Sequence, residues 1–502
     1  MNTPLLERYR DRIAGVLTCY DRIVITGTLP GACHAAGMTS FLKAHQIRIF
    51  DYPRFAEPLR ERIRENAERL AAMHGVRIEY IAKAHIRKED VVAAVIRTRG
   101  DHPGLVHIIS AMEACSSYSA WHDKASHQTF LRPASGKCLH FYFYFIDPDL
   151  GLVYVRVPTW CPFRLQLYCN GHSWLARQLS AAGIDYAMAD NAFLRIADWE
   201  RAQQLADSLS PDVLHSILDR YAEQCCPVRD VFDQRYHWSL MQIECSTDLA
   251  FRSEAVMKPL YQAISREAIV SVKAEQVMGF LGKKMSPALA QELDSRLSTR
   301  IEGTCIKHRM GKNSIKMYDK FGRVLRIETT SNDVSFFKHH RKVEHRDGHA
   351  TRELASVKKS IYSLIDLRDI LLGCNRRYLE FLSALDDFSA GKRNLDRLTM
   401  PKNVDGHRVK GCNFFDKTEH ALLCALQAPR FNIAGVRRAD LKPLLPQLSA
   451  ASISRYLKRL RLLGLIKKIS NRYRYYLTRL GRNSIAAACK LSEQFIIPAL
   501  AG

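Results

Sequence analysis

The stretch SAASISRYLKRLRLLGLIKKISNRYRYYL, residues 449–477, decides the expected fold of the C-terminal part of this chain. Ser449 stands where a helix is capped, and Gly464 stands where a helix ends in a left-handed residue. Between them, apolar residues recur at the spacing of one buried helix face: Ile453, Leu457 and Leu460. The pattern predicts a helix with one side in a core and the other free for a partner.

A short hairpin is expected directly after this helix. Residues 465–469 and 472–477 flank a turn at Asn471, and the second run alternates Arg and Tyr with period two. The preceding sequence, from Phe414 to Leu445, has the apolar content for two more helices. Helices followed by a two-stranded hairpin are typical of a winged helix-turn-helix.

Basic residues are concentrated in the same region. Fourteen Lys or Arg and a single acid, Asp440, lie between Arg430 and Arg482, whereas the whole chain has a net charge of +24. Such a concentration predicts binding to phosphates, and duplex DNA is the expected partner. The predicted nucleic-acid-binding residues are Ser452, Arg455, Lys458, Arg459, Arg461, Lys467, Lys468, Arg472 and Arg474. The alternative is a solvated basic surface without a ligand.

Two resemblances accompany these patterns. Residues 449–468 and 472–482 resemble MarR-type winged-helix proteins, which implies a contact surface for DNA or for another protein. The chain as a whole resembles uncharacterised bacterial proteins associated with mobile elements, in stretches such as DRIVITGTLPG (21–31) and SIKMYDKFG (314–322). The second resemblance implies no mechanism and no functional residue.

The composition is that of a globular protein. The chain has 502 residues, 47% of them hydrophobic, which predicts several domains with sizeable cores. We find no run of eighteen apolar residues and no signal segment, so a cytoplasmic, nucleoid-associated protein without a membrane partner is expected. The 14 cysteines form no Cys-x-x-Cys pair, which favours buried thiols over a disulfide framework.

The expected fold class is mixed α/β with several domains. Short apolar runs alternate with helical patterns over residues 1–200, which predicts an α/β domain. Residues 201–388 are predicted to be mainly helical, with a strand at 238–245 and a hairpin at 314–329. A linker at 389–411 would precede the winged helix at 412–502.

Carboxylates near strand ends give one hypothesis for a metal site. Asp51 follows the run Ile47 to Phe50, and Glu113 follows Leu105 to Ile109. If these strands are parallel neighbours, both acids could bind Mg²⁺ or Mn²⁺, with His140 or Asp190 as further ligands. Alternatively, Asp51 caps a turn and Glu113 is solvated.

The hairpin at 314–329 gives a second hypothesis. Lys316 and Tyr318 would share one face, with Arg326 and Glu328 on a face opposite. The pattern YDK, a turn and LRIE resembles replication initiators that nick DNA, which implies Tyr318 as nucleophile and Asp319 and Glu328 as metal ligands. The histidine pair of many such enzymes is not evident, because His339 and His340 follow the hairpin. The alternative is a structural hairpin with cross-strand ion pairs.

A histidine cluster follows at 339–349. His345 and His349 have the spacing of a zinc site on a helix, but Arg346, Asp347 and Gly348 predict a turn, which favours a basic loop.

The sequence therefore leads to a ranked set of functions. The first is a nucleic-acid-binding protein that contacts duplex DNA through its winged helix and acts in mobile-element maintenance, with RNA and oligomerisation left open. The second is an enzyme, a metal-dependent nuclease, nickase or recombinase. The third is a MarR-like transcription regulator, although some four hundred residues before the winged helix exceed the needs of a simple regulator.

Overall fold

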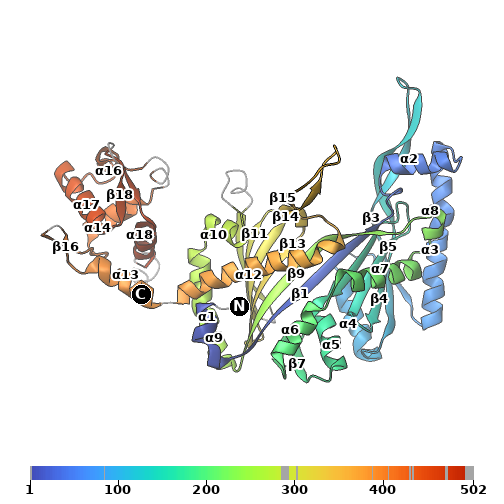
Figure 1. Ribbon diagram of the computed structural model, residues 1–502, viewed down its shortest axis with the longest axis horizontal. Helices are drawn as coiled ribbons and strands as arrows, with labels where there is room; N and C mark the ends of the chain where they lie inside the picture. Colours follow the sequence, from blue (N-terminus) through green and yellow to red (C-terminus); the bar gives the residue numbers. More distant parts are fainter. Residues whose placement is uncertain are drawn as a thin grey trace. The chain divides into compact units, whose positions relative to one another are not determined.

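The chain folds into two compact units, unit 1 from Met1 to Asp386 and unit 2 from Asp387 to Gly502 (Figure 1). The computed structural model describes residues 3–83, 85–283, 293–300, 303–386, 388–404, 406–428, 431, 435–469 and 473–491. Both units combine helices and strands, so the predicted mixed α/β, multidomain class is confirmed.

Unit 1 is organised on an eleven-stranded sheet of order β10-β11-β12-β13-β9-β1-β6-β5-β4-β3-β2. Its strands are β1 (Ile13–Thr28), β2 (Ile78–Tyr80), β3 (Gly104–Asp123), β4 (Gln128–Asp147), β5 (Gly151–Pro158), β6 (Leu165–Asn170), β9 (His237–Phe251), β10 (Leu293–Arg300), β11 (Gly303–Met310), β12 (Asn313–Lys320) and β13 (Val324–Ser331). The pair β2 and β3 is parallel, and the other neighbours are antiparallel.

The sheet crosses the boundary that the sequence analysis places at residue 200. Strand β1 pairs with β6 on one side and with β9 on the other, so strands from both predicted domains join in one layer. The range 201–388 contributes five strands to this sheet in addition to its helices. The hairpin predicted at 314–329 is confirmed as β12 and β13.

Helices cover both faces of the sheet. One face packs on α2 (Ala35–Ala44), α3 (Tyr52–His74), α7 (Pro211–Cys225) and α12 (Leu364–Asp386) in the largest hydrophobic core. The other face packs on α4 (Lys88–Arg99), α5 (Gly171–Ala181), α6 (Trp199–Asp207) and the small sheet of β7 (Tyr186–Ala189) and β8 (Ala192–Ile196). The remaining helices of unit 1 are α1 (Pro4–Arg8), α8 (Arg229–Phe232), α9 (Glu254–Ser271) and α10 (Ala274–Phe280).

A bulge in β1 places two charged residues on the same face. The register of β1 against β9 shifts between Tyr20 and Ile23, so the usual alternation is interrupted. Asp21 accepts a hydrogen bond from Asn170 of β6, and the Arg22 guanidinium lies over the ring of Tyr168, two residues earlier on that strand. Because residues two apart share a face, Asp21 and Arg22 both point towards the side of α4 and α5.

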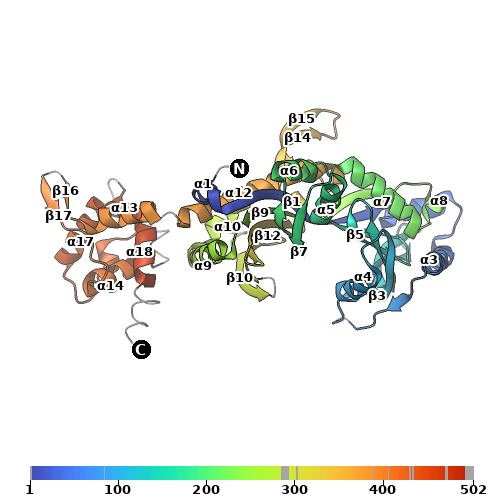
Figure 2. The ribbon, with the colours of Figure 1, turned by 90° about the horizontal axis from the view of Figure 1, so that it is seen from below.

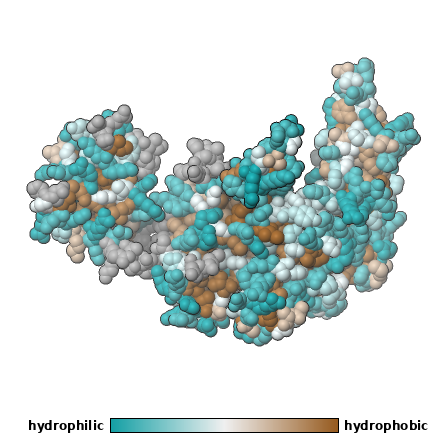
Figure 3. Space-filling model, viewed as in Figure 1, coloured by the Kyte–Doolittle hydropathy of each residue, from teal (hydrophilic) through white to brown (hydrophobic). Residues whose placement is uncertain are grey.

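A hairpin of β14 (Lys338–Glu344) and β15 (Ala350–Ser356) extends away from the rest of unit 1 in two views (Figures 1 and 2). Most of its side chains are exposed or half-buried, and its visible surface is hydrophilic (Figure 3). Within the described residues, every helix falls short of the length and apolar character needed to span a bilayer. None of the 14 cysteines is part of a disulfide, and Cys33, Cys115 and Cys424 are the three that are not fully buried.

Unit 2 contains the helix predicted from residues 449–464. Ser449 caps α17 (Ala450–Leu462) by accepting a hydrogen bond from the Ser452 amide, and Gly464 has a φ of 80°. The residues of its predicted apolar face are buried: Ile453, Leu457 and Leu460. The hairpin also forms, since β18 (Ile466–Lys468) pairs with β19 (Tyr475–Leu477).

The other elements of unit 2 precede and follow this motif. They are α13 (Phe388–Thr399), β16 (Lys402–Val404), β17 (His407–Val409), α14 (Lys417–Leu426), α16 (Arg438–Leu441) and α18 (Arg479–Leu491). The succession of α14, α16, α17 and the β18–β19 hairpin has the element order of a winged helix. The range 389–411, predicted as a linker, instead contains most of α13 and the β16–β17 hairpin.

Because units 1 and 2 have separate hydrophobic cores, we expect a core substitution to lower the stability of one unit without affecting the other. Leu457→Ala should lower the stability of unit 2 by about 2–5 kcal/mol, because the removed side chain is buried and leaves a cavity. Differential scanning calorimetry should show one transition moved to lower temperature and the other unchanged. The exposed Arg455→Ala is the control on the same helix. A shift of both transitions together would contradict independent cores.

Candidate active site

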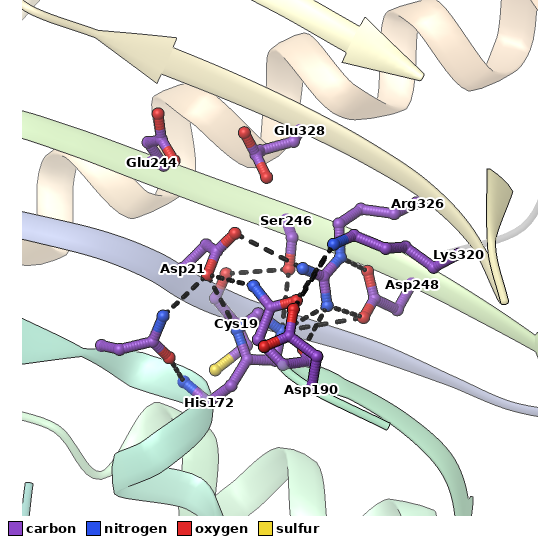
Figure 4. Close-up of polar contacts among 12 residues, drawn as sticks. Cys19, Asp21, His172, Asp190, Glu244, Ser246, Asp248, Lys320, Arg326 and Glu328 are labelled. Atoms are coloured by element: carbon purple, nitrogen blue, oxygen red, sulfur yellow. Dashed lines mark hydrogen bonds and ion pairs between the residues drawn. The ribbon is translucent and has the colours of Figure 1, made fainter. Parts of the chain in front are cut away.

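Charged and polar side chains line one face of four neighbouring strands in unit 1. Strand β13 presents Arg326 and Glu328 on this face, and β12 presents Lys316, directly opposite Glu328 in the register. The further members are Asp21 on β1 and Glu244, Ser246 and Asp248 on β9. Figure 4 shows these groups from β1, β9 and β13 turned towards one another, with His172 of α5 beside them. The face is therefore polar at a position where a sheet of this size usually has an apolar core.

Arg326 is at the centre of one part of this face and is completely buried. Its Nε and Nη2 each lie 2.7 Å from an oxygen of Asp248, and its Nη1 lies 3.4 Å from Asp21. The Nη2 atom also donates to the Asn191 carbonyl at 2.7 Å and lies 3.0 Å from His172 Nε2. The two parallel bonds to one carboxylate are the strong geometry for an arginine ion pair.

These contacts keep Asp21 and Asp248 ionised. Burial opposes ionisation of Asp21, but His172 and Arg326 outweigh it and hold the pKa of Asp21 well below its usual value. Burial also opposes ionisation of Asp248, and Arg326 together with His172 lowers its pKa. The guanidinium is thus compensated by two carboxylates inside the protein.

The second part of the face is a cluster of three carboxylates around a lysine, which we call the carboxylate cluster: Asp21, Glu244, Glu328 and Lys316. One oxygen from each acid lies within 4.8 Å of the others. Lys316 Nζ lies 2.5 Å from Glu328 Oε1 and 3.3 Å from Glu244 Oε1. The ammonium group therefore occupies the place of a cation bound by the carboxylates.

The cluster contains more negative charge than Lys316 can balance. Burial raises the pKa of Glu328 to about 8, with Glu244 and Asp21 adding to the rise and Lys316 opposing it. Burial disfavours the charge on Lys316 as well, but Glu328 and Glu244 outweigh it and raise the pKa of Lys316 well above its usual value. Glu328 therefore holds its proton more tightly than an ordinary carboxyl group does.

Access to the cluster is on the side of Glu244. The side chains of Glu244 and Lys316 are 12% and 11% exposed, whereas that of Glu328 is 3% exposed. Arg22 is an exposed neighbour and lines a cavity of about 290 Å³ together with Tyr144, Tyr154 and Tyr168 and residues of α4. Arg22 is thus both an electrostatic neighbour of Glu244 and a wall residue of a space large enough for a small molecule.

Of the three catalytic residues predicted from the hairpin, Glu328 lies in the candidate site, whereas Tyr318 and Asp319 have structural surroundings. Glu328 is a member of the carboxylate cluster. Lys316 and Glu328 share one face, so the prediction that they lie on opposite faces was wrong. They form a cross-strand ion pair, as the alternative interpretation of the hairpin predicted. Burial raises the pKa of Tyr318, which opposes a nucleophilic role. Asp319 accepts a hydrogen bond from the Gly322 amide at 2.9 Å and thereby holds the turn, not a metal ion.

The acids predicted at strand ends are not brought together. Among the described residues, the groups close enough to share a metal ion contain neither Asp51 nor Glu113. Asp51 precedes α3 and lies 3.0 Å from Arg48, as expected for a residue at a helix start. Glu113 binds Lys88, Tyr142 and Arg156, which overcome burial and lower its pKa to about 2.

The further ligands proposed with them have other neighbours. His140 is buried beside the Cys138 carbonyl, and burial lowers the pKa of His140 to about 4. Asp190 lies 3.9 Å from Lys320. His345 and His349 flank the turn of the β14–β15 hairpin, so the predicted turn is confirmed and a helical zinc pair is excluded.

The predicted basic surface of unit 2 is incomplete. The residues Arg455, Lys458, Arg461, Lys467 and Lys468 are exposed, while Ser452 and Arg474 are half-buried. Arg459 is different, because its side chain is only 17% exposed and its Nη2 lies 2.6 Å from Glu419 of α14. Arg459 is therefore held by an acid of its own unit, unlike the exposed cations of this surface. Arg472 lies outside the described residues.

Comparison with known proteins identifies neither a family nor a function for this chain. No family model and no curated protein matches this chain. A class II 3-hydroxy-3-methylglutaryl-CoA reductase from Streptococcus pneumoniae, in a structure bound to NADPH, matches with a TM-score of 0.17 and 10% identity, over 89% of this chain and 78% of the reductase. A likeness this weak carries no argument about the reaction or the cofactor of this protein.

The functional prediction from the sequence is corrected at this point. The comparisons match no nucleic-acid-binding protein, and one of the cations assigned to DNA is held by Glu419. We therefore abandon the duplex-DNA-binding function and, with it, the nuclease, nickase and MarR-like alternatives. The polar face of unit 1 remains as the candidate site.

Several members of this site escaped the sequence analysis. Asp21, Glu244 and Asp248 were not predicted, because their runs look like ordinary strands, whereas Lys316 and Arg326 were predicted only as charged residues of the hairpin. A usable signal was present, since Glu244 and Asp248 are four residues apart and Arg326 and Glu328 two apart in otherwise apolar or small strands. Even spacing of charges within such a run indicates one polar strand face.

The buried ion pairs predict a large effect of removing Arg326. Arg326→Met should destabilise unit 1 by about 3–5 kcal/mol, because Asp248 and Asp21 would be left as uncompensated buried charges. Urea unfolding monitored by circular dichroism measures the change. The exposed Arg309→Met on β11 is the control, with an expected change within about 0.5 kcal/mol. Equal stability of the two variants would show that Arg326 does not hold these strands.

Proposed function

We propose that this protein is an enzyme whose reaction site is the carboxylate cluster, and that Mg²⁺ or Mn²⁺ is its cofactor. The observation that carries the proposal is the position of Lys316 Nζ, 2.5 Å from Glu328 and 3.3 Å from Glu244, among three acids with oxygens within 4.8 Å. A structural ion pair needs one carboxylate for one lysine. Lys316 has two carboxylate partners, Glu328 and Glu244, and the second carboxylate supports a site that also receives a cation from solution.

The donor set favours a hard divalent ion. The three acids offer carboxylate oxygens alone, which suit Mg²⁺ and Mn²⁺, and these ions keep several water molecules when few protein ligands are present. Metal binding would remove the proton from Glu328 and move the Lys316 ammonium away from the acids. Lys316 would then be a free cation beside the metal.

The surroundings favour a phosphorylated small molecule as substrate. Arg22, Lys307 and Lys316 supply positive charge near Glu244, and the adjoining cavity has the tyrosines Tyr144, Tyr154 and Tyr168 in its wall. The phosphate would face the metal and the cations, and an apolar or aromatic group would occupy the cavity. Its volume of about 290 Å³ fits a small ligand.

The corresponding reaction is hydrolysis of a phosphate ester. Asp21, Glu244 and Glu328 would hold the metal ion, which would supply activation of the attacking water. Water forms the new bond to phosphorus and gives its proton to solvent, while the ester bond from phosphorus to the leaving oxygen breaks. The Lys316 ammonium donates a proton to that leaving oxygen, is reprotonated from solvent, and stabilises the charge that develops there in the transition state.

Metal binding itself is testable through its pH dependence. Glu328 must lose its proton to bind a cation, so the affinity for Mn²⁺ should rise about tenfold per pH unit until the pH reaches its pKa of about 8. Isothermal titration calorimetry of the whole chain measures the affinity. Glu328→Gln should weaken binding and remove most of the pH dependence. Asp51→Asn is the control, because Asp51 lies outside the cluster, and an equal loss in this variant would contradict the assignment.

The reaction is tested with p-nitrophenyl phosphate and bis(p-nitrophenyl) phosphate in the presence of Mn²⁺. Lys316→Met should lower kcat by about 10²–10³-fold, the usual cost of losing one group that stabilises developing charge. Arg22→Ala should raise KM with a smaller change in kcat. Release of p-nitrophenol that needs no metal, or that persists in Glu328→Gln, would overturn the proposed function.

A further inference from the structure

A second group of metal-binding side chains lies in unit 2, between α14 and α18. His420 and Cys424 are four residues apart on α14, so they lie on the same side of that helix. Cys489 of α18 faces them across the interface of the two helices. Cys489 follows Cys424 by 65 positions in the sequence, and no local motif links them.

The three side chains converge on one point. Cys424 Sγ lies 2.8 Å from Cys489 Sγ, and it lies 3.7 Å from His420 Nδ1 and 3.9 Å from His420 Nε2. One ligand atom from each residue lies within 4.8 Å of the other two. Cys489 is 6% exposed, whereas His420 and Cys424 are half-buried. The group is therefore anchored in the core of unit 2 and open on one side.

We propose that His420, Cys424 and Cys489 form a binding site for Zn²⁺, with water as the fourth ligand. Two thiolates and one imidazole are ligands that zinc prefers, and tetrahedral coordination accepts a solvent molecule in the remaining position. Bond lengths of about 2.3 Å to sulfur and about 2.0 Å to nitrogen separate the ligand atoms by about 3.5–3.8 Å. The imidazole already has this separation from Cys424, and the two sulfurs need to move apart by about 1 Å.

His420 favours a metal site over a disulfide at this position. Two sulfurs in contact would suffice for a disulfide, and an imidazole has no part in that bond. The imidazole beside Cys424 supplies a third ligand on the open side of the pair, where an ion can enter. Bound zinc would join α14 to α18 and stabilise the fold of unit 2.

This inference is independent of the proposed enzyme function. The site is in another unit, and its sulfur and nitrogen ligands select zinc, whereas the carboxylate cluster offers oxygen alone. Either proposal can be disproved without the other, because calorimetry with Mn²⁺ tests the carboxylate cluster and the Co²⁺ spectrum tests the sulfur site.

Cobalt substitution tests the site in the full chain. The protein is purified with a phosphine reductant, freed of metal with a chelator and titrated with Co²⁺. We expect a sulfur-to-cobalt charge-transfer band in the near ultraviolet, together with the visible bands of four-coordinate Co²⁺, and stoichiometric displacement of the cobalt by Zn²⁺. Ions bound to the carboxylate cluster give no thiolate band, so the two sites are distinguishable.

Substitutions assign the band to these residues. Cys424→Ser should abolish the charge-transfer band, and His420→Asn should weaken cobalt binding by at least about tenfold, because metal affinity depends on each ligand. Cys33→Ser, a half-buried free cysteine of unit 1, is the control and should leave the spectrum unchanged. Circular dichroism confirms that each variant is folded, and the partly exposed Cys424 is preferred to Cys489 for this reason.

Three results would overturn the proposal. They are the absence of a thiolate-to-cobalt band in the folded wild-type protein, a band that persists in Cys424→Ser, and a Cys424–Cys489 disulfide whose reduction does not restore cobalt binding.

Discussion

The buried charge of Arg326 is the constraint on which unit 1 depends. The positive charge of a buried guanidinium must be balanced by acids and hydrogen-bond acceptors. Asp248 of β9 and Asp21 of β1 supply the negative charge for Arg326. His172 of α5 and the Asn191 carbonyl, in the β7–β8 turn, supply further polar contacts. A slip of one residue between β13 and β9 would turn Arg326 towards the apolar core beneath α12. The ion pairs therefore fix the register of the strands that also hold the candidate site.

The same charge sets the chemistry of its neighbours. Asp21 belongs to both parts of the polar face, because Arg326 and His172 keep it ionised while one of its oxygens remains close to Glu328 and Glu244. A permanent negative charge in a buried position makes ionisation of Glu328 unfavourable, which contributes to its pKa of about 8. Asp21 thus links the Arg326 ion pairs to Glu328. The raised pKa of Glu328 depends in part on the same ion pairs that fix the register of the sheet.

The sequence predicts the local elements and misses the distant pairings. Helix α17 with its Ser449 cap, and the hairpin of β12 and β13, follow from spacing and turn residues within some twenty positions. The pairing of β1 with β9 joins segments more than two hundred residues apart, and the bulge after Tyr20 hides Asp21 from a simple alternation. Asp51 and Glu113 failed as a pair because they require parallel neighbouring strands, whereas β3 continues into antiparallel β4 and Asp51 begins a helix. Glu328 was predicted as a site residue through its place in the hairpin, where Lys316 and Arg326 were also named.

The two proposed metal sites must discriminate between ions that compete for both. Zinc binds more tightly than Mg²⁺ or Mn²⁺ to almost any set of ligands, so the carboxylate cluster cannot exclude it by affinity alone. Ligand type provides the distinction, since the thiols of Cys424 and Cys489 compete for zinc far better than carboxylates do. On these assignments, scarce zinc occupies unit 2 first, and the oxygen ligands of unit 1 remain for the abundant hard cation. The separation of soft and hard ligands into different units thereby allows a structural ion and a catalytic ion to coexist.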